Sequence, residues 1–438
     1  MVEADRAEQK LAELMGRLGA YFTRVEPVRQ AGKYVRGLMS DLPRKNCWTL
    51  AEYAGDRTPD RMQRLLERAS WNTLEAMDTV RDFVVEHLAD PQGLTVLVLD
   101  ESGDEKTGTH TAGVKRQYVG CAGKVANAVN FVNATYSTPR GHALVGSRLY
   151  VPAEYLADDQ VRTQMGIPTS LSFNTKPELG LELLAQHLAA GIDIGWCTAD
   201  AVYGRDRKLR RFCEDNGVGY VLGVPCSFQI TLAVGVTMRA DATLKMLSRR
   251  AWQVVSCGPG SKGDRCYAFA WLGTASPRHF LLIRRSLAKP SEVAYFYCFV
   301  PEHTPATLGV LVAVCGRRWT VEEDHEFGKD QFGFDQSQAR LYTPIMRHIT
   351  LVMAALAVCA VTAADARANT APPPTPTRPD QPPPPDPGLI PLTVVEVKRL
   401  YNLLTRAWQD IEHHLHWSWW RRRHQARARW YHHRARLA

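Results

Sequence analysis

The sequence lacks the features of secreted, cysteine-bound metal and membrane proteins. Its ten cysteines stand singly, without a Cys-x-x-Cys pair, which indicates free thiols and a reducing compartment. The N-terminus has no basic stretch followed by an apolar core, so no secretory leader is expected. The longest apolar run, 349–364, is shorter than a membrane span, and we expect a buried helix there. A cytoplasmic protein without a membrane partner is predicted.

Acidic residues are missing from one end of the chain. The whole sequence has 54 Lys and Arg against 45 Asp and Glu, a net charge of +9, but no acid follows Trp417. This end interleaves tryptophan with arginine, including Arg421, Arg422 and Arg423, which suits phosphate neutralisation and stacking on bases. A merely solubilising end is the alternative. The histidines nearby lack cysteine partners and fixed spacing, so they do not indicate a metal site.

Four segments are predicted along the 438 residues. Residues 1–90 carry apolar positions at helical spacing, which predicts an all-helical N-terminal domain. Residues 91–370 are predicted to form an α/β catalytic domain with a β-rich insertion at about 225–314 and an apolar helix, 345–364, that closes the core. A proline-rich linker at 371–391 leads to a basic helical tail, 392–438.

The order of elements within 91–224 indicates the α/β fold more closely. Apolar strand patterns are followed by helix, strand, helix and strand, which is the order of a ribonuclease-H-like core. The expected strands are 94–100, 128–135, 143–151, 192–200 and 220–224, and the expected helices are 178–190 and 206–216. In the insertion, the glycine-rich stretch 258–263 has Gly263 after its lysine, so it predicts a hairpin turn and not a phosphate loop.

Two short helices around a glycine turn are expected in the N-terminal domain. One ends near Gly55, and Pro59 opens the next. Basic residues flank the pair, and Arg44 and Lys45 are the candidate DNA contacts of a helix-turn-helix. A structural helical bundle with a solvated charged face is an equally good interpretation.

Asp100 and Asp200 each follow a buried apolar run that is expected to end at the carboxylate. In the ribonuclease-H-like order, the first and fourth strands are neighbours, so both carboxylates are expected at one edge of the sheet. Hard oxygen ligands suit two Mg²⁺ or Mn²⁺ ions, and two such ions suit phosphodiester chemistry. For each aspartate alone, capping of the next turn is the competing interpretation.

A third carboxylate is expected from a helix, and Glu322 fits best. At about 100° per residue, Arg318 and Lys329 fall on the same helix face as Glu322. A carboxylate between two cations suits a metal ligand that also meets phosphates. Glu323 and Asp324 point elsewhere, and Glu326 is the substitute candidate.

These motifs resemble the DDE transposases of bacterial insertion sequences, the group with a tyrosine-arginine-glutamate-lysine signature and a β-rich insertion. The resemblance rests on Leu99-Asp100-Glu101-Ser102-Gly103, on Asp200-Ala201-Val202-Tyr203-Gly204 and on the Arg318, Glu322 and Lys329 spacing. It also includes the stretch 147–152, where Arg148 is a candidate DNA contact. The signature tyrosine, three residues before Arg318, is replaced by Cys315.

The resemblance implies catalysis by Asp100, Asp200 and Glu322 with two metal ions. It implies double-stranded DNA as substrate, with terminal inverted repeats cut and then joined to a target, a homodimer on DNA, and a place at the bacterial nucleoid. Trp319, beside the signature arginine, is a candidate for stacking on a displaced base, and packing within the protein is the favoured alternative. Two alternatives stay open: a transposase-derived DNA-binding protein without catalysis, and a generic ribonuclease-H-like nuclease.

Overall fold

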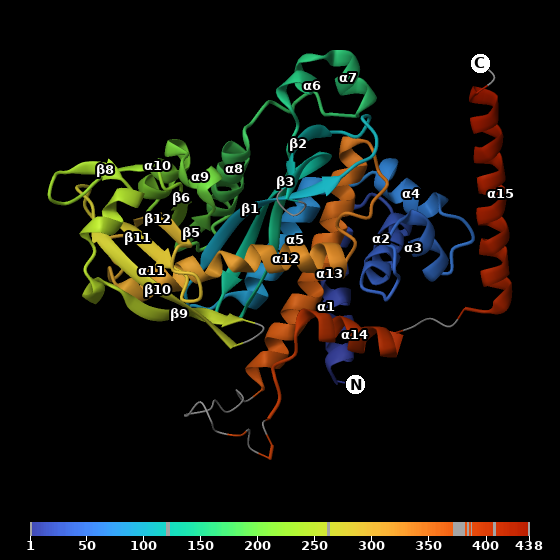
Figure 1. Ribbon diagram of the computed structural model, residues 1–438. Helices are drawn as coiled ribbons and strands as arrows, with labels where there is room; N and C mark the ends of the chain where they lie inside the picture. Colours follow the sequence, from blue (N-terminus) through green and yellow to red (C-terminus); the bar gives the residue numbers. More distant parts are fainter. Residues whose placement is uncertain are drawn as a thin grey trace. The chain divides into compact units, whose positions relative to one another are not determined.

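The computed structural model describes residues 2–119, 123–260, 263–370, 382, 385–386, 388–405 and 409–436. Most of the expected proline-rich linker lies outside these residues. The chain divides into two compact units, one made of Met1–Val80 with Phe327–Ala438 and the other of Arg81–Glu326 (Figure 1). Each unit is considered separately below.

The first unit is helical. A long apolar helix, α13, is surrounded by helices from both ends of the chain, because α1, α2, α4 and α14 all contact it. In its most apolar 18-residue window, 94% of the helix is buried within the protein. It is therefore a core helix, although it is long enough to cross a membrane. The helices of this unit are α1 (Val2–Leu18), α2 (Val25–Leu38), α3 (Cys47–Tyr53), α4 (Asp60–Glu67), α13 (Tyr342–Ala368), α14 (Val394–Thr405) and α15 (Ile411–Ala435).

The predicted pair of short helices is present as α3 and α4. Asn46 caps α3, since its side chain accepts hydrogen bonds from the backbone of Trp48 at 3.0 Å and Thr49 at 3.2 Å. Gly55 follows with φ of 74°, a left-handed conformation that costs glycine little. Pro59 then stands directly before α4. The glycine turn between two short helices is confirmed.

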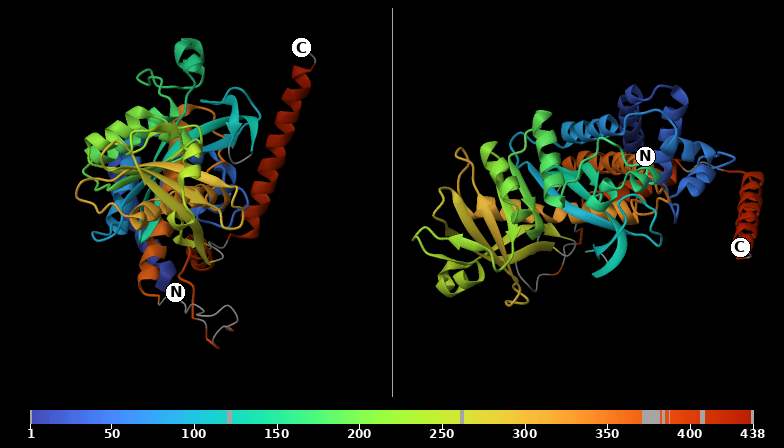
Figure 2. Two further views of the ribbon diagram at one scale, coloured as in Figure 1. Left: turned by 60° about the vertical axis from the view of Figure 1, so that its left-hand side comes forward. Right: turned by 90° about the horizontal axis from the view of Figure 1, so that it is seen from above.

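The second unit contains one continuous sheet (Figures 1 and 2). Its order is β2-β3-β1-β5-β6-β12-β11-β10-β9, and β4 also pairs with β3, on the side opposite β1. β1, β5 and β6 are parallel, and the other pairs are antiparallel. The strands are β1 (Val96–Glu105), β2 (Lys115–Val119), β3 (Lys124–Thr138), β4 (Gly141–Leu149), β5 (Trp196–Ala199), β6 (Gly219–Val224), β9 (Gln253–Gly260), β10 (Gly263–Gly273), β11 (His279–Arg285) and β12 (Val293–Phe299).

The β-rich insertion extends this sheet. The expected hairpin is formed by β9 and β10, which are antiparallel; its tip, 261–262, lies outside the described residues. β12 then pairs with β6, so four insertion strands continue the sheet of the central strands. A small separate sheet of β7 (Gln229–Thr231) and β8 (Thr237–Arg239) precedes them.

Helices cover both faces of the central strands, which explains the unbroken apolar runs. Along β1, side chains alternate between faces. Val96 and Val98 belong to a core cluster with Leu311 of α11, whereas Leu99 faces α8 beside Gly180. The helices with residues in this unit are α5 (Thr73–Leu88), α6 (Ala153–Ala157), α7 (Asp159–Gln164), α8 (Lys176–Ala189), α9 (Ala201–Gly204), α10 (Arg207–Asp215), α11 (Leu308–Arg317) and α12 (Trp319–Asp330).

Candidate active site

Asp100 lies where β1 loses its parallel neighbour. The parallel ladder with β5 ends at the pair Leu99 and Ala199. The antiparallel ladder with β3 continues to Glu105. The expectation that the strand ends at Asp100 is therefore wrong, because pairing with the long β3 carries β1 five residues further. Asp100 is instead the first residue of β1 beyond the parallel ladder.

Asp200 directly follows the end of β5. It is the N-cap of the short helix α9, and its Oδ1 accepts a hydrogen bond of 2.8 Å from the backbone of Val202. Because Leu99 and Ala199 are partners on neighbouring parallel strands, Asp100 and Asp200 are the next residues at the same sheet edge. The predicted neighbourhood of these strands is confirmed, and the capping role of Asp200 is present as well.

Burial and mutual repulsion perturb these two carboxyl groups. Burial raises the pKa of Asp100 to about 7, and the nearby charge of Asp200 adds to the effect. The backbone N–H of Glu101, which donates to Asp100 Oδ1 at 2.8 Å, and the charge of Arg318 act in the opposite direction. Burial also raises the pKa of Asp200. Both carboxyl groups are therefore less easily ionised than ordinary aspartates, because they are buried and close to other negative charges.

Glu101 is a further acid at this edge that the sequence reasoning missed. Its Oε1 lies 3.0 Å from Lys176 Nζ on α8, and its charge contributes to the raised pKa of Asp200. Its Oε2 is buried and has no hydrogen-bond partner within the described chain. The available signal in the sequence was its position next to Asp100. Neighbouring residues of a strand point to opposite faces, so Glu101 lies on the other face of β1.

Arg318 interacts electrostatically with both Glu322 and Asp100. Its Nη2 lies 2.5 Å from Glu322 Oε1. Burial alone would lower the pKa of Arg318, but Glu322 and Asp100 outweigh burial and raise it. Arg318 thus lies between the helix carboxylate and the two sheet carboxylates. Lys329 follows Glu322 on the same helix, α12.

The first half of α12 is fixed to the sheet by a buried ionic cluster. Asp324 is fully buried; it accepts a hydrogen bond of 2.7 Å from Thr135 Oγ1 on β3 and lies 2.9 Å from His142 Nδ1 on β4. The other ring nitrogen of His142 lies 3.0 Å from Glu323. Burial would lower the pKa of His142, but the two acids raise it to about 9. Glu323 and Asp324 therefore anchor the helix that carries Glu322, in agreement with their predicted direction away from it.

The donor set fits divalent cations that prefer oxygen. Asp100, Asp200 and Glu322 supply carboxylate oxygens, and the repulsion that raises the pKa of Asp100 is the kind that a bound cation relieves. In the described part of the chain, the oxygens of the three predicted ligands do not all lie within 4.8 Å of one another. The fit therefore rests on chemistry and charge.

Two residues near the signature arginine, Trp319 and Cys315, differ in exposure. Trp319 is 44% exposed, and the guanidinium of Arg265 lies 5.9 Å from its ring centroid. Cys315, in contrast, is 3% exposed and packs in the core beneath the sheet with Cys257 and Cys298. Burial raises the pKa of its thiol to about 12. Trp319 is accessible to a ligand, and Cys315 is a core residue.

Two of the predicted DNA contacts are engaged within their own units. Arg148 is buried: Nε donates to Glu182 of α8 at 2.8 Å, and Nη2 contacts Gln186. Lys45 is also buried, and its Nζ donates to the carbonyl oxygen of Leu42 at 2.8 Å. Arg44 has an exposed side chain. The structure therefore leaves Arg44 more accessible to DNA than Lys45 or Arg148, whose DNA contacts remain predictions.

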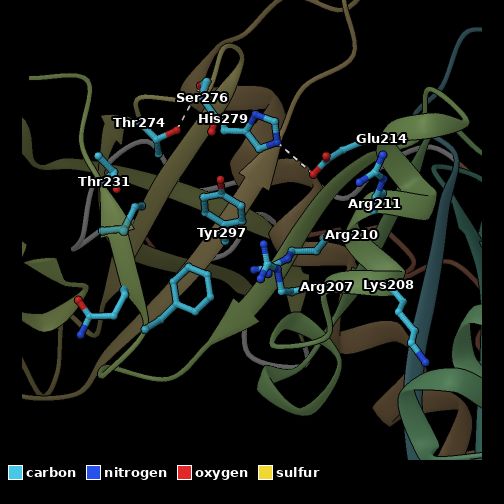
Figure 3. A pocket seen from close by; sticks show the side chains of 13 residues that line it. Arg207, Lys208, Arg210, Arg211, Glu214, Thr231, Thr274, Ser276, His279 and Tyr297 are labelled. Carbon is cyan, nitrogen blue, oxygen red and sulfur yellow. Dashed lines mark hydrogen bonds and ion pairs between the residues drawn. The ribbon is translucent and has the colours of Figure 1, made fainter. Parts of the chain in front are cut away.

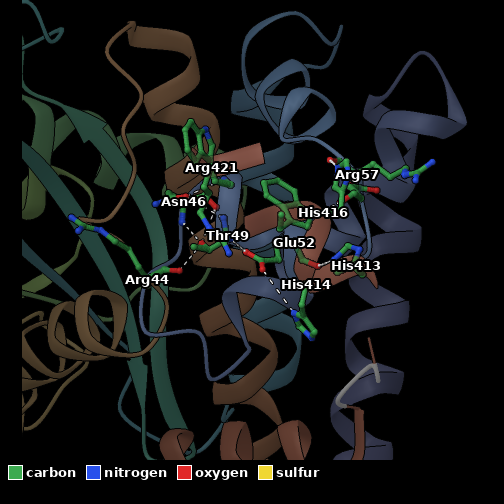
Figure 4. Close-up of polar contacts among 12 residues, drawn as sticks. Arg44, Asn46, Thr49, Glu52, Arg57, His413, His414, His416 and Arg421 are labelled. Carbon is green, nitrogen blue, oxygen red and sulfur yellow. Dashed lines mark hydrogen bonds and ion pairs between the residues drawn. The ribbon is translucent and has the colours of Figure 1, made fainter. Parts of the chain in front are cut away.

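The basic tail is the helix α15, and its first half is docked on α3 (Figure 4). Trp417 is fully buried, and its ring N–H donates to the carbonyl oxygen of Asp56 at 2.9 Å. Arg421 pairs with Glu52 of α3, and His413 contacts the Glu52 carbonyl oxygen at 2.8 Å. Beyond this contact the helix is exposed, including Arg422 and Arg423. His413 therefore helps dock the helix, and the later arginines face solvent.

Comparisons with known proteins find two matching families, a curated relative and a solved structure. Residues 17–237 match a family described as DDE superfamily endonuclease, and residues 160–358 match the transposase DDE domain. A curated relative from Microchaete diplosiphon, named as a probable transposase for insertion sequence element IS701, is 25% identical over 326 residues, covering 72% of this chain and 78% of the relative. A solved piggyBac transposase synaptic complex with hairpin DNA aligns with 87% of this chain and 70% of its own, at 10% identity and a TM-score of 0.46.

Proposed function

The chain belongs to the DDE superfamily of endonucleases, as a transposase of the insertion-sequence class, and we propose that it cuts and joins DNA at the ends of a mobile element. Asp100, Asp200 and Glu322 are its catalytic acids. Terminal inverted repeats are the specific substrate, and a target duplex receives the cut ends. The protein acts at the bacterial nucleoid as a homodimer on DNA.

Two Mg²⁺ or Mn²⁺ ions, when bound, supply activation of the attacking oxygen and stabilisation of the leaving oxygen. The chain's own residues hold and orient the carboxylates that would bind these ions. Asp100 is partly protonated near neutral pH because its pKa is raised to about 7, and a bound cation would favour its ionised form. Arg318 orients Glu322 through their ion pair and balances the negative charge of the sheet carboxylates. Lys329 and Trp319 contact the DNA beside the reacting phosphate.

The strand order supports a ribonuclease-H-like core. Three antiparallel strands, β4, β3 and β1, are followed by the parallel strands β5 and β6, in the spatial order β4-β3-β1-β5-β6. Asp100 lies on the third strand of this series, and Asp200 directly follows the fourth. The β-rich insertion enters after β6 and precedes the helix of Glu322.

DNA outside the reacting phosphate is held by the helical unit. Arg44, beside the α3–α4 pair, is placed to meet a duplex, and Lys45 supports that loop. The exposed arginines of α15 provide contacts to phosphates that do not depend on sequence. The curated relative is named for an insertion sequence element, which supports element ends as the substrate.

One observation carries the proposal: Asp100 and Asp200 follow partnered residues on adjacent parallel strands, and the charge of Asp200 raises the pKa of Asp100. The test is cleavage of a labelled duplex that carries the native gene-flanking ends, in Mg²⁺ or Mn²⁺. We expect metal-dependent cutting at the ends by the wild type and a loss of about 10³-fold or more in Glu322→Gln, with DNA binding retained.

Glu326→Gln is the matched control, because Glu326 is an exposed acid on the same helix. It should cut like the wild type. If Glu326→Gln loses cleavage and Glu322→Gln does not, Glu326 is the third acid. If neither the wild type nor any variant cuts the ends while all bind them, the protein is a transposase-derived DNA-binding protein. Cutting without joining to a target would indicate a generic nuclease.

A further inference from the structure

A basic groove lies within the sheet-containing unit, between α10 and the insertion strands (Figure 3). Its volume is about 870 Å³. One wall is the helix face with Arg207, Arg210 and Arg211, and the opposite wall carries hydroxyl side chains from the insertion. Thr231, Thr274 and Ser276 supply these hydroxyls. The proposed cleavage chemistry uses none of these residues.

Arg210 points into the groove with part of its hydrogen-bonding capacity unused. Its guanidinium carbon lies 5.3 Å from the ring centroid of Phe228 and 5.4 Å from that of Tyr297. Its Nη1 atom is buried and has no hydrogen-bond partner within the described chain. A buried donor without an acceptor is unfavourable, and an anion in the groove would supply an acceptor.

The acid in the groove is occupied by other partners. Glu214 Oε1 accepts a hydrogen bond of 2.7 Å from Tyr220 and lies 3.1 Å from His279 Nε2 (Figure 3). Arg207 and Arg211 are exposed, and Arg211 Nε lies 3.6 Å from Asp215 Oδ2 at the end of the same helix. The groove therefore keeps an excess of positive charge, which favours a polyanionic occupant.

The arginine spacing suits a nucleic-acid backbone. Arg207 and Arg211 are four residues apart on α10, a rise of about 6 Å along the helix axis. They therefore lie on one face, at a separation that lets them contact successive phosphates of one strand. The hydroxyls on the opposite wall add neutral donors, which commonly contact phosphate and sugar oxygens.

We infer that this groove binds the phosphodiester backbone of the duplex on one side of the cleavage site. The inference rests on the proposed function, because it takes DNA as the substrate. The sheet provides the connection: Asp200 follows β5, β5 pairs with β6, and β6 pairs with β12, which lines the groove. α10 begins seven residues after Asp200. The groove therefore lies two strands from β5 in the sheet, and we expect a duplex with its reacting phosphate at the carboxylates to extend to it.

The test is the salt dependence of duplex binding in EDTA, where cleavage plays no part. The variant is Arg207→Gln/Arg211→Gln, and both side chains are exposed. Loss of two phosphate contacts should reduce the slope of log K against log salt by about 2. The affinity defect should then shrink about tenfold between about 50 and 200 mM salt.

Lys245→Gln/Arg250→Gln is the matched control, since both residues are exposed, lie in the insertion and do not line the groove. It removes the same charge and should leave the slope close to that of the wild type. An unchanged slope in the α10 variant, or an equal change in both variants, would overturn the inference. If the wild type cleaves DNA but the salt slope of the α10 variant is unchanged, only the groove proposal is rejected. If the slope of the α10 variant is reduced but the wild type does not cleave DNA, the groove proposal stands and the proposed catalysis is rejected.

Discussion

Arg318 Nη2 lies 2.5 Å from Glu322 Oε1, and the same guanidinium also lowers the pKa values of Asp100 and Asp200. One cation thus interacts with an acid from a helix and with two acids from adjacent strands. It only partly offsets the repulsion between them, because burial and Asp200 still hold the pKa of Asp100 near 7. The arrangement favours an additional positive charge.

The raised pKa of Asp100 predicts a pH-dependent stability without divalent ions. Between pH 4 and pH 7 the folded protein holds a proton on Asp100 that the unfolded chain releases, so the free energy of unfolding falls as pH rises through this range. Asp100→Asn should remove this fall. Thermal midpoints measured in EDTA from pH 4 to pH 8 test it, and parallel curves for the two proteins would show that Asp100 titrates normally.

His142 should stabilise the helix that carries Glu322. His142→Gln leaves Asp324 buried without its charged partner, and we expect a loss of about 3 kcal/mol in the free energy of unfolding, measured in urea. The pKa of His142 is raised to about 9, so its stabilisation is complete below about pH 6.5 and disappears as pH rises through 9. The variant should therefore show a weaker loss of stability between pH 7 and pH 10.

His303→Gln is the control for this prediction, because His303 is exposed. It should unfold like the wild type throughout the range. A wild type whose stability does not change between pH 7 and pH 10 would contradict a charged His142.

The sequence predicted the central elements well because they combine strong local signals. The apolar run before Asp100 is buried on both faces, and Asn46, Gly55 and Pro59 give α3 and α4 their boundaries. The length of β1 was not predictable, because the residues after Asp100 are polar and are held in the strand by pairing with β3. The packing partners of α13 were not predictable either, because its apolar residues do not reveal which helices pack against it.

The candidate site was predictable in its acids but not in its supports. The strand positions of Asp100 and Asp200 and the helix face of Glu322 follow from periodicity. Long-range contacts leave no such pattern: nothing near His142 in the sequence indicates its pairing with Asp324, 182 residues away. For the same reason Arg148, a candidate DNA contact, could not be recognised as a partner of Glu182.

Trp417 should hold the basic tail on α3. Trp417→Ala removes a fully buried ring and its hydrogen bond to Asp56, which we expect to cost about 3–5 kcal/mol in the docking of α15. Hydrogen exchange should become faster in α15 while α13 stays protected. Trp430→Ala is the control, since Trp430 is 58% exposed and should leave the exchange rates unchanged. Equal protection of α15 in both variants would refute this docking role.

Cys315 should tolerate small side chains and reject the signature tyrosine. Gly316, the next residue, is so close to β9 that an added Cβ would lie 2.2 Å from the Cys257 carbonyl oxygen. Because α11 packs this tightly, Cys315→Tyr is expected to cost about 1–3 kcal/mol of stability, whereas Cys315→Ala should fold and cut DNA. Urea unfolding and end cleavage measure the two effects. A stable, more active Cys315→Tyr would show that this position reaches the DNA.

The most direct test of the central claim is to locate the metal ions along the chain. Fe²⁺ can replace Mg²⁺, and with ascorbate and peroxide it generates hydroxyl radicals that cut the nearest backbone. The account predicts cuts near Asp100, Asp200 and Glu322 in the wild type, suppressed by excess Mg²⁺ and absent from Asp200→Asn. Cuts confined to other segments, such as the histidines of α15, or cuts that persist unchanged in Asp200→Asn, would contradict a metal site built from these three acids.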